Sequence, residues 1–255
     1  TSDVPHWPKR LDVYYKHGAL PEPTKDRKYF NGFVDLFSVA TPADRTLVKA
    51  LICDLMWYRN GMASPLWLTD SVNGRGSGKS AIFELITELY LSKCSDMNQN
   101  DLKFKSDEIV KRIISAGGRE RKTLFMDNAV GTISSSTLAG WITASHISGR
   151  APYGVGEESR PNDLTFAISS NSAVLDDDLA VRSFQLSMMK PDNYDPKWLE
   201  DVQAYTEKYR WHILAEIYDM LDNAKKLDCK IRTRFSNFER DVLHAVCDDE
   251  AECEA

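Results

Sequence analysis

A glycine-rich stretch contains the residue types and spacing that could bind phosphate. Its sequence, SVNGRGSGKSAI at residues 71–82, matches G-x-x-x-x-G-K-[ST] except at the first position, where Asn73 replaces glycine. In such a loop, main-chain N–H groups and the next helix N-terminus point at phosphates, the lysine reaches the outer phosphates, and the hydroxyl binds Mg²⁺. Lys79 and Ser80 occupy these last two positions. The stretch therefore predicts a site for ATP and Mg²⁺.

Asparagine is an acceptable replacement for the first glycine, because it visits left-handed backbone conformations at modest cost. Gly74 beside it supplies further freedom, so we expect the loop still to hold a triphosphate. The alternative is a flexible glycine loop that precedes an ordinary helix. The residues predicted to contact the nucleotide are Asn73, Gly74, Arg75, Gly76, Ser77, Gly78, Lys79, Ser80 and Ala81.

The segments around the loop agree with a nucleotide site. Residues 66–69 form an apolar run that predicts a buried strand leading into the loop. After the loop, Ile82, Leu85, Ile86 and Leu89 recur at i, i+3, i+4 and i+7, which predicts a helix with one buried face. Strand, loop and helix in this order are the context that the motif requires.

A second apolar run, residues 123–126, ends at an acidic residue that could serve the same site. Asp127 is expected to end this strand and to hold Mg²⁺ through water, together with Ser80. The alternative is an aspartate that merely ends a strand or caps a helix. Most ATPases of this kind have a glutamate next, whereas this chain has Asn128. An amide can orient water but cannot take its proton, so we expect slow hydrolysis.

The remaining segments predict an α/β fold with a mostly parallel sheet flanked by helices. Helices are expected from Thr41 to about Gly61 and over 106–115, 135–144 and 198–221, and a third strand over 164–169, terminating at Asn171. The predicted organisation is an N-terminal arm and helical preface at 1–62, a nucleotide-binding core at 63–190, a helical lid at 191–247 and a solvated, frayed acidic tail at 248–255.

Composition excludes several classes of protein. No apolar stretch approaches the ~20 residues that cross a bilayer, so we expect a soluble protein of a bacterial or host cytoplasm with no membrane partner. The net charge of -6 leaves nucleic-acid binding to a local basic surface. The five cysteines have no C-x-x-C spacing, which argues against a disulfide framework and against a zinc site.

From about residue 41 to 190 the chain resembles the AAA+ ATPases of helicase superfamily three, particularly the phage, plasmid and poxvirus-type primase-helicases. The stretches that carry the resemblance are GRGSGKS, TLFMDN, LAGWITASHISGRAPYG, RPNDLTFAISSN and DDDLAVRSFQLSM. The resemblance implies an AAA+ P-loop core in which Lys79, Asp127, Asn128, Asn171 and Arg182 act in ATP hydrolysis.

The resemblance implies that Asn171 is the sensor of the γ-phosphate or attacking water. It also implies that Arg182 is an arginine finger in a neighbouring subunit's site, which requires a homo-oligomeric ring, usually a hexamer. Alternatively, Asn171 only ends a strand, and Arg182 pairs with one of the aspartates at 176–178.

The resemblance also implies a hairpin between residues 150 and 160 that grips single-stranded DNA in the ring's pore. Arg150, Tyr153 and Arg160 are the candidate contacts, because cations bind phosphates and aromatic rings stack on bases. Glu157 and Glu158 depart from the pattern, since carboxylates repel the DNA backbone. A second candidate surface is basic and lies in the preface: Lys9, Arg10, Lys16, Arg27 and Lys28.

Three functions remain open on the sequence alone. The first is an ATP-dependent DNA helicase or translocase for replication of a phage or mobile element. The second is a weakly hydrolysing, nucleotide-gated replication initiator or loader that assembles on DNA or on a replication or host protein, which Asn128 and the acidic hairpin favour. The third, a small-molecule kinase, is disfavoured because residues 197–221 predict an amphipathic packing helix rather than an arginine-rich lid.

Overall fold

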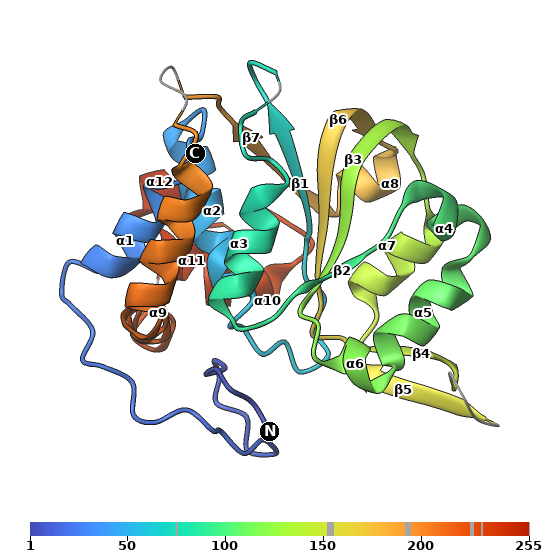
Figure 1. Ribbon diagram of the computed structural model, residues 1–255, viewed down its shortest axis with the longest axis horizontal. Coiled ribbons are helices and arrows are strands. Elements are labelled where there is room, and N and C mark those ends of the chain that lie inside the picture. Colours follow the sequence, from blue (N-terminus) through green and yellow to red (C-terminus); the bar gives the residue numbers. More distant parts are fainter. Residues whose placement is uncertain (75, 152–155, 192–194, 225–226, 231, 255) are drawn as a thin grey trace. The chain divides into compact units, whose positions relative to one another are not determined.

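The computed structural model describes residues 1–74, 76–151, 156–191, 195–224, 227–230 and 232–254 (Figure 1). The chain divides into two compact units. The first contains residues 1–58, 71–91 and 187–255, and the second contains residues 59–70 and 92–186. The predicted division into preface, core, lid and tail stays a prediction, and the two units are described one at a time.

A five-stranded sheet forms the centre of the second unit. The last residues of its strands β1 and β7 are assigned to the first unit. The strand order is β2 (Cys94–Asp96), β3 (Thr123–Ile133), β6 (Thr165–Leu175), β1 (Leu66–Ser71) and β7 (Ser183–Met188). The pairs β2/β3, β3/β6 and β6/β1 are parallel. This arrangement confirms the predicted α/β class with a mostly parallel sheet flanked by helices.

The strands form where the sequence has short, continuous apolar runs. Strands that are covered on both faces are apolar at successive positions rather than at alternate ones. The first halves of β1, β3 and β6 follow this rule, and their side chains at 66–68, 124–126 and 166–168 are buried. The register places Leu66 of β1 and Leu124 of β3 on either side of Phe166, so β6 is the central strand of the sheet.

The helices of the second unit are α4 (Gln99–Phe104), α5 (Ser106–Ile114), α6 (Ala116–Arg119), α7 (Ser136–Thr143) and α8 (Asp177–Ala180). Strands β4 (His146–Arg150) and β5 (Glu157–Pro161) form a separate antiparallel hairpin. Helix α5 buries Ile109, Val110, Ile113 and Ile114 on one face and contacts β4 (Figure 1). The predicted hairpin is therefore present.

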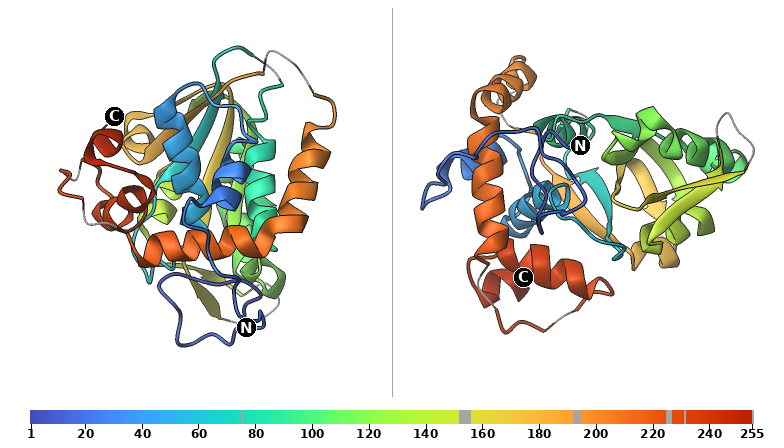
Figure 2. Two further views of the ribbon diagram at one scale, coloured as in Figure 1. Left: turned by 90° about the vertical axis from the view of Figure 1, so that its left-hand side faces the viewer. Right: turned by 90° about the horizontal axis from the view of Figure 1, so that it is seen from below.

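The first unit is helical around the phosphate loop. Its helices are α1 (Lys28–Val34), α2 (Pro42–Asp54), α3 (Ala81–Leu89), α9 (Trp198–Asp222), α10 (Ser236–Phe238), the π-helical turn η1 (Glu239–Leu243), α11 (His244–Val246) and α12 (Glu250–Glu254). The long helix α9 contacts α1, α3 and α11 (Figure 2). Buried Glu216 of α9 accepts hydrogen bonds from Thr24 and from the N–H of Phe30, which ties the N-terminal arm to this helix.

Two sequence predictions for the first unit need correction. Thr41 caps α2 as expected, but the helix ends at Asp54 rather than near Gly61. The acidic tail is not frayed throughout, because Glu252 of α12 binds the Thr46 hydroxyl and lies 3.7 Å from the Lys49 ammonium. Among the described residues, none of the helices is both long enough and apolar enough to span a membrane.

Candidate functional site

The phosphate loop links β1 to α3 and has the backbone shape that its glycines permit. Gly74, Gly76 and Gly78 have φ angles of 95°, 87° and 83°, in the region that disfavours other residues. The Ile82 N–H donates to the Gly78 carbonyl at 3.0 Å, so the loop runs directly into the first turn of the helix. The Ser80 side chain does not cap α3. Arg75 lies outside the described residues.

Asn73 has a different role from the one expected. It is absent from the residues with positive φ, so the explanation by left-handed backbone is wrong. Its side chain instead braces the loop: Nδ2 donates to the Lys190 carbonyl at 3.2 Å, and Oδ1 accepts from the Lys190 N–H at 2.7 Å. Glycine cannot make these bonds. Among the described residues at the start of the loop, Gly74 supplies the positive φ.

A cavity of about 390 Å³ adjoins the loop within the first unit. Its walls include Gly76, Ser77 and Gly78 of the loop, Ala81 of α3, and Trp198 and Leu199 of α9. The Trp198 ring lies so close to Gly78 that a Cβ there would come within 3.1 Å of it. Trp198 is itself fixed, since its Nε1 donates to the Leu36 carbonyl at 2.7 Å. The volume falls in the range of small-molecule sites.

Ser77 carries an unsatisfied polar atom in this cavity wall. The residue is only 6% exposed, and its hydroxyl has no hydrogen-bond partner within the described part of the chain. A buried polar group without a partner costs roughly 1–3 kcal/mol. A ligand in the cavity would remove this cost once the buried hydroxyl rotates toward it.

The second unit contains a polar cluster that joins three of the predicted catalytic residues. Asp127 accepts a hydrogen bond from the Ser169 hydroxyl at 2.6 Å and one from the Asn128 amide at 2.6 Å. Asn171 donates to the Asn128 side-chain carbonyl at 3.0 Å. Ser169 is buried, Asn171 is partly buried, and Asp127 and Asn128 are exposed. These four residues are called the Asp127 cluster below.

Two irregularities in the pairing of β3 with β6 bring this cluster together. In a regular strand, adjacent side chains point to opposite faces. Here Met126 pairs with Ile168 and Ala129 with Ser170, so two residues of β3, Asp127 and Asn128, lie opposite one residue of β6. Such a bulge redirects side chains and is frequent beside active sites. Asn128 has a φ of 54°, and its main-chain N–H also binds Ser169, at 2.8 Å.

The second irregularity lies on β6. Ala129 pairs with Ser170 and Gly131 with Ala173, which leaves Asn171 and Ser172 opposite a single residue of β3. Ser172 has a φ of 68°. The predicted ends of both strands are therefore wrong, since β3 and β6 continue to Ile133 and Leu175. Asp127 and Asn171 lie at bulges within strands rather than at their ends.

Arg182 follows α8 (Asp177–Ala180) in the second unit, and its side chain pairs with a residue of that helix. Its Nη2 forms an ion pair with Asp178 at 2.6 Å, and its Nε donates to the Asp178 carbonyl at 3.1 Å. This is one of the pairs considered as the alternative to an arginine finger. The Arg182 side chain is only 16% exposed, so action on another subunit requires this pair to break. The finger role stays a prediction.

The predicted DNA contacts fall into different environments. Arg150 is exposed at the end of β4, and Tyr153 lies outside the described residues. Arg160 is only 3% exposed and donates to the carbonyls of Ile113 and Gly118. Burial alone would raise the pKa of Asp163, but the Arg160 guanidinium, 2.6 Å away, holds it below its usual value. Arg160 therefore fastens the hairpin to α5 and α6, and its assignment as a DNA ligand needs correction.

Sequence reasoning missed Ser169, Lys190 and Trp198. Ser169 had a signal, because a polar residue next to the apolar run of β6 must find a buried partner. Lys190 and Trp198 had none, since each lies more than a hundred positions from the loop residue that it contacts. In the preface, Arg10 pairs with Asp12 and Lys16 with Asp3, which lowers the charge that this second basic surface offers to DNA.

Comparison with known proteins gives a fold but no family. No family model matches the chain, and no curated protein matches it. Two similar solved structures are described as A-form apo structures of the NrS-1 C-terminal region, the second covering residues 305–718. The first has a TM-score of 0.53 and 12% identity, over 90% of this chain and 53% of that one. The second has a TM-score of 0.51 and 13% identity, over 77% and 49%.

At such low identity the likeness shows that the fold is shared. The chain spans about half the length of the chains in these two structures.

Proposed function

We propose that this chain is the ATPase part of a DNA helicase or translocase that serves replication of a phage or mobile element as a homo-oligomeric ring, a hexamer in the resembled family. The observation that carries the nucleotide site is the buried, unpartnered Ser77 hydroxyl in a loop whose glycines adopt positive φ beside a cavity. A phosphate oxygen is the natural acceptor for such a hydroxyl and for main-chain N–H groups at a helix N-terminus.

The proposal gives the loop and the Asp127 cluster a shared role, as the resembled family implies. The loop follows β1, and the cluster follows the buried runs of β3 and β6, which are parallel neighbours in the order β3-β6-β1. In open α/β sheets, ligands bind beyond the carboxyl ends of the strands. In this proposal Lys79 and Ser80 bind the phosphates and Mg²⁺, and Asp127 holds Mg²⁺ through water.

In this proposal, Asn128 and Asn171 position the attacking water. Their amides are fixed by the chain of hydrogen bonds through Asp127 and Ser169, so they can orient a water molecule beside the γ-phosphate. Neither amide can accept the proton of that water. Turnover is therefore slow in this proposal.

Replacing Asn128 by glutamate tests this role. We expect ATP turnover to rise at least tenfold, because a positioned carboxylate adds general-base catalysis, which is worth about 10²–10⁴-fold before losses from the strained backbone. The matched control is Asn128→Gln, which places a longer amide on the same left-handed backbone and should not raise turnover. Steady-state phosphate release measures both. Equal rates in the two variants would contradict the assigned role.

A second candidate is a nucleotide-gated assembly module that hydrolyses ATP poorly. Two observations favour it: the amide at position 128, and the exposed carboxylates of Glu157 and Glu158 in the hairpin. Glu158 lies 3.5 Å from Arg119, which offsets part of that negative charge. Because Arg160 is buried, Arg150 is the cation among the described residues that is left to contact single-stranded DNA in this proposal.

One experiment separates these functions. ATP turnover is measured with and without single-stranded DNA, alongside mass photometry with a non-hydrolysable ATP analogue. Stimulated turnover and a ring support the motor, whereas nucleotide-dependent assembly with negligible turnover supports the module. A chain that stays monomeric and transfers phosphate to a metabolite would be a kinase and would contradict both.

A further inference from the structure

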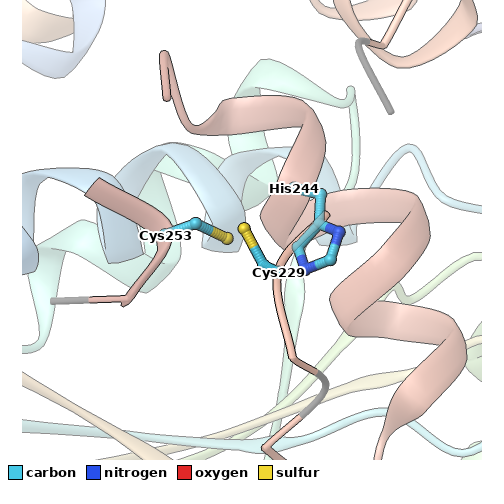
Figure 3. Close-up of side chains that lie close together, drawn as sticks. All are labelled: Cys229, His244 and Cys253. Atoms are coloured by element: carbon cyan, nitrogen blue, oxygen red, sulfur yellow. The ribbon is translucent and has the colours of Figure 1, made fainter. Parts of the chain in front are cut away.

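Three potential metal ligands converge in the C-terminal part of the first unit, away from the phosphate loop in sequence. Cys229 lies between α9 and α10, His244 begins α11, and Cys253 lies in α12. Their ligand atoms all lie within 4.8 Å of one another (Figure 3). The sequence order is Cys229-x14-His244-x2-Cys247-x5-Cys253, which lacks the C-x-x-C spacing of familiar zinc sites. The spacing therefore concealed a grouping that the fold creates.

His244 gives an independent indication that the cluster binds a ligand. The residue is only 6% exposed, and its Nε2 has no hydrogen-bond partner among the residues that the structure describes. Buried ring nitrogens are normally hydrogen-bonded or bound to metal. A cation coordinated by this histidine and the thiols would satisfy it.

A fourth thiol adjoins the three. Cys247 follows α11 as its C-cap residue, and its Sγ donates to the Leu243 carbonyl at 3.1 Å. The Cys253 thiol interacts electrostatically with the thiols of Cys247 and Cys229, so Cys247 lies next to the cluster. Three sulfurs and one imidazole nitrogen form a ligand set typical of structural zinc.

The distances suit a small cation. Zinc bonds to sulfur at about 2.3 Å and to nitrogen at about 2.0–2.1 Å, so neighbouring ligands in a tetrahedron lie about 3.4–3.8 Å apart. The ligand atoms of Cys229, His244 and Cys253 already lie within 4.8 Å of one another and need to move by only about 1 Å to reach this geometry. The Cys247 thiol would complete the tetrahedron by turning away from the Leu243 carbonyl. Soft thiolates with imidazole select zinc over Mg²⁺, which prefers oxygen ligands.

We propose that Cys229, His244, Cys247 and Cys253 bind one structural Zn²⁺. The proposed ligands come from the segment after α9, from α11 with its C-cap, and from α12, so the cation fastens these three segments to one another. Four protein ligands leave no open position, so the site is structural rather than catalytic. The proposal is independent of ATP binding.

Metal analysis of the full chain, purified under reducing conditions without chelator, tests the proposal. We expect about one zinc per chain by elemental analysis and native mass spectrometry, and its loss in Cys229→Ser and in Cys253→Ser. Cys94→Ser is the matched control, because Cys94 belongs to β2 in the second unit, and it should keep the zinc. Wild-type chain without zinc, or zinc that persists in both cluster variants, would overturn the proposal.

Cobalt titration keeps the test decisive if the variants fold poorly. Co²⁺ added to metal-free wild-type chain should give the visible bands of a tetrahedral site and a thiolate charge-transfer band, the latter weaker in Cys247→Ser. An unchanged band in Cys247→Ser would overturn the four-ligand assignment. A wild-type chain that gives no band, or whose cluster cysteines are joined by a disulfide under reducing conditions, would overturn the metal site itself.

Discussion

Replacing Lys79 by alanine is expected to reduce ATP turnover by about 10²- to 10³-fold, the usual cost of removing one group that stabilises developing charge. Lys79 directly precedes Ser80 at the start of α3, and Gly78 before it has a φ of 83° that turns the chain into the helix. In our account its ammonium contacts the outer phosphates, both when ATP binds and when the γ-phosphate leaves. The variant should therefore lose nucleotide affinity as well as turnover.

Phosphate release and calorimetric ATP binding measure the two effects of Lys79→Ala. The control is Lys93→Ala, which removes the same side chain from an exposed position of the second unit and should retain full activity. Thermal melting of each variant shows whether it is folded. A folded Lys79→Ala chain with wild-type affinity and rate would mean that the loop does not hold phosphate.

Replacing Asp127 by asparagine is expected to lower Mg²⁺-dependent turnover roughly 10³-fold, because a metal-stabilised transition state is worth several kcal/mol. The substitution keeps the size of the side chain, and its carbonyl can still accept the hydrogen bond from Ser169. It removes the negative charge and places a second amide donor opposite that of Asn128. The expected loss therefore comes from weaker Mg²⁺ binding and from a disturbed Asn128.

A binding measurement separates Asp127 from the loop. Asp127→Asn should bind ATP without Mg²⁺ as tightly as the wild-type chain does, whereas Lys79→Ala should not. Asp96→Asn is the control, since Asp96 is exposed in the neighbouring strand β2. If Asp127→Asn turned over ATP at the wild-type rate at limiting Mg²⁺, the carboxylate would have no part in metal binding.

The sequence predicted most of the elements that position the site, because these elements depend on local patterns. Helix α5 was expected over 106–115 and spans Ser106–Ile114, and α9 was expected over 198–221 and spans Trp198–Asp222. Both have long apolar faces with helical spacing. The apolar first halves of β1, β3 and β6 could also be predicted from the sequence, because buried parallel strands are continuous apolar runs.

The polar halves of β3 and β6 could not be predicted in the same way. Beyond Met126 and Ser170 the strands contain polar residues and bulges, and their pairing depends on a partner about forty positions away. The same limit explains Asn73, whose role depends on Lys190, and Arg160, whose partners include the Gly118 carbonyl. Contacts between distant residues have no local signature.

The most direct test of the central claim, that the glycine loop binds the phosphates of ATP, is calorimetric titration of the wild-type chain with ATP and Mg²⁺. Our account predicts a saturable heat with about one site per chain, which disappears in Lys79→Ala. A folded wild-type chain that gives no heat at any ATP concentration, or an equal heat with Lys79→Ala, would contradict it.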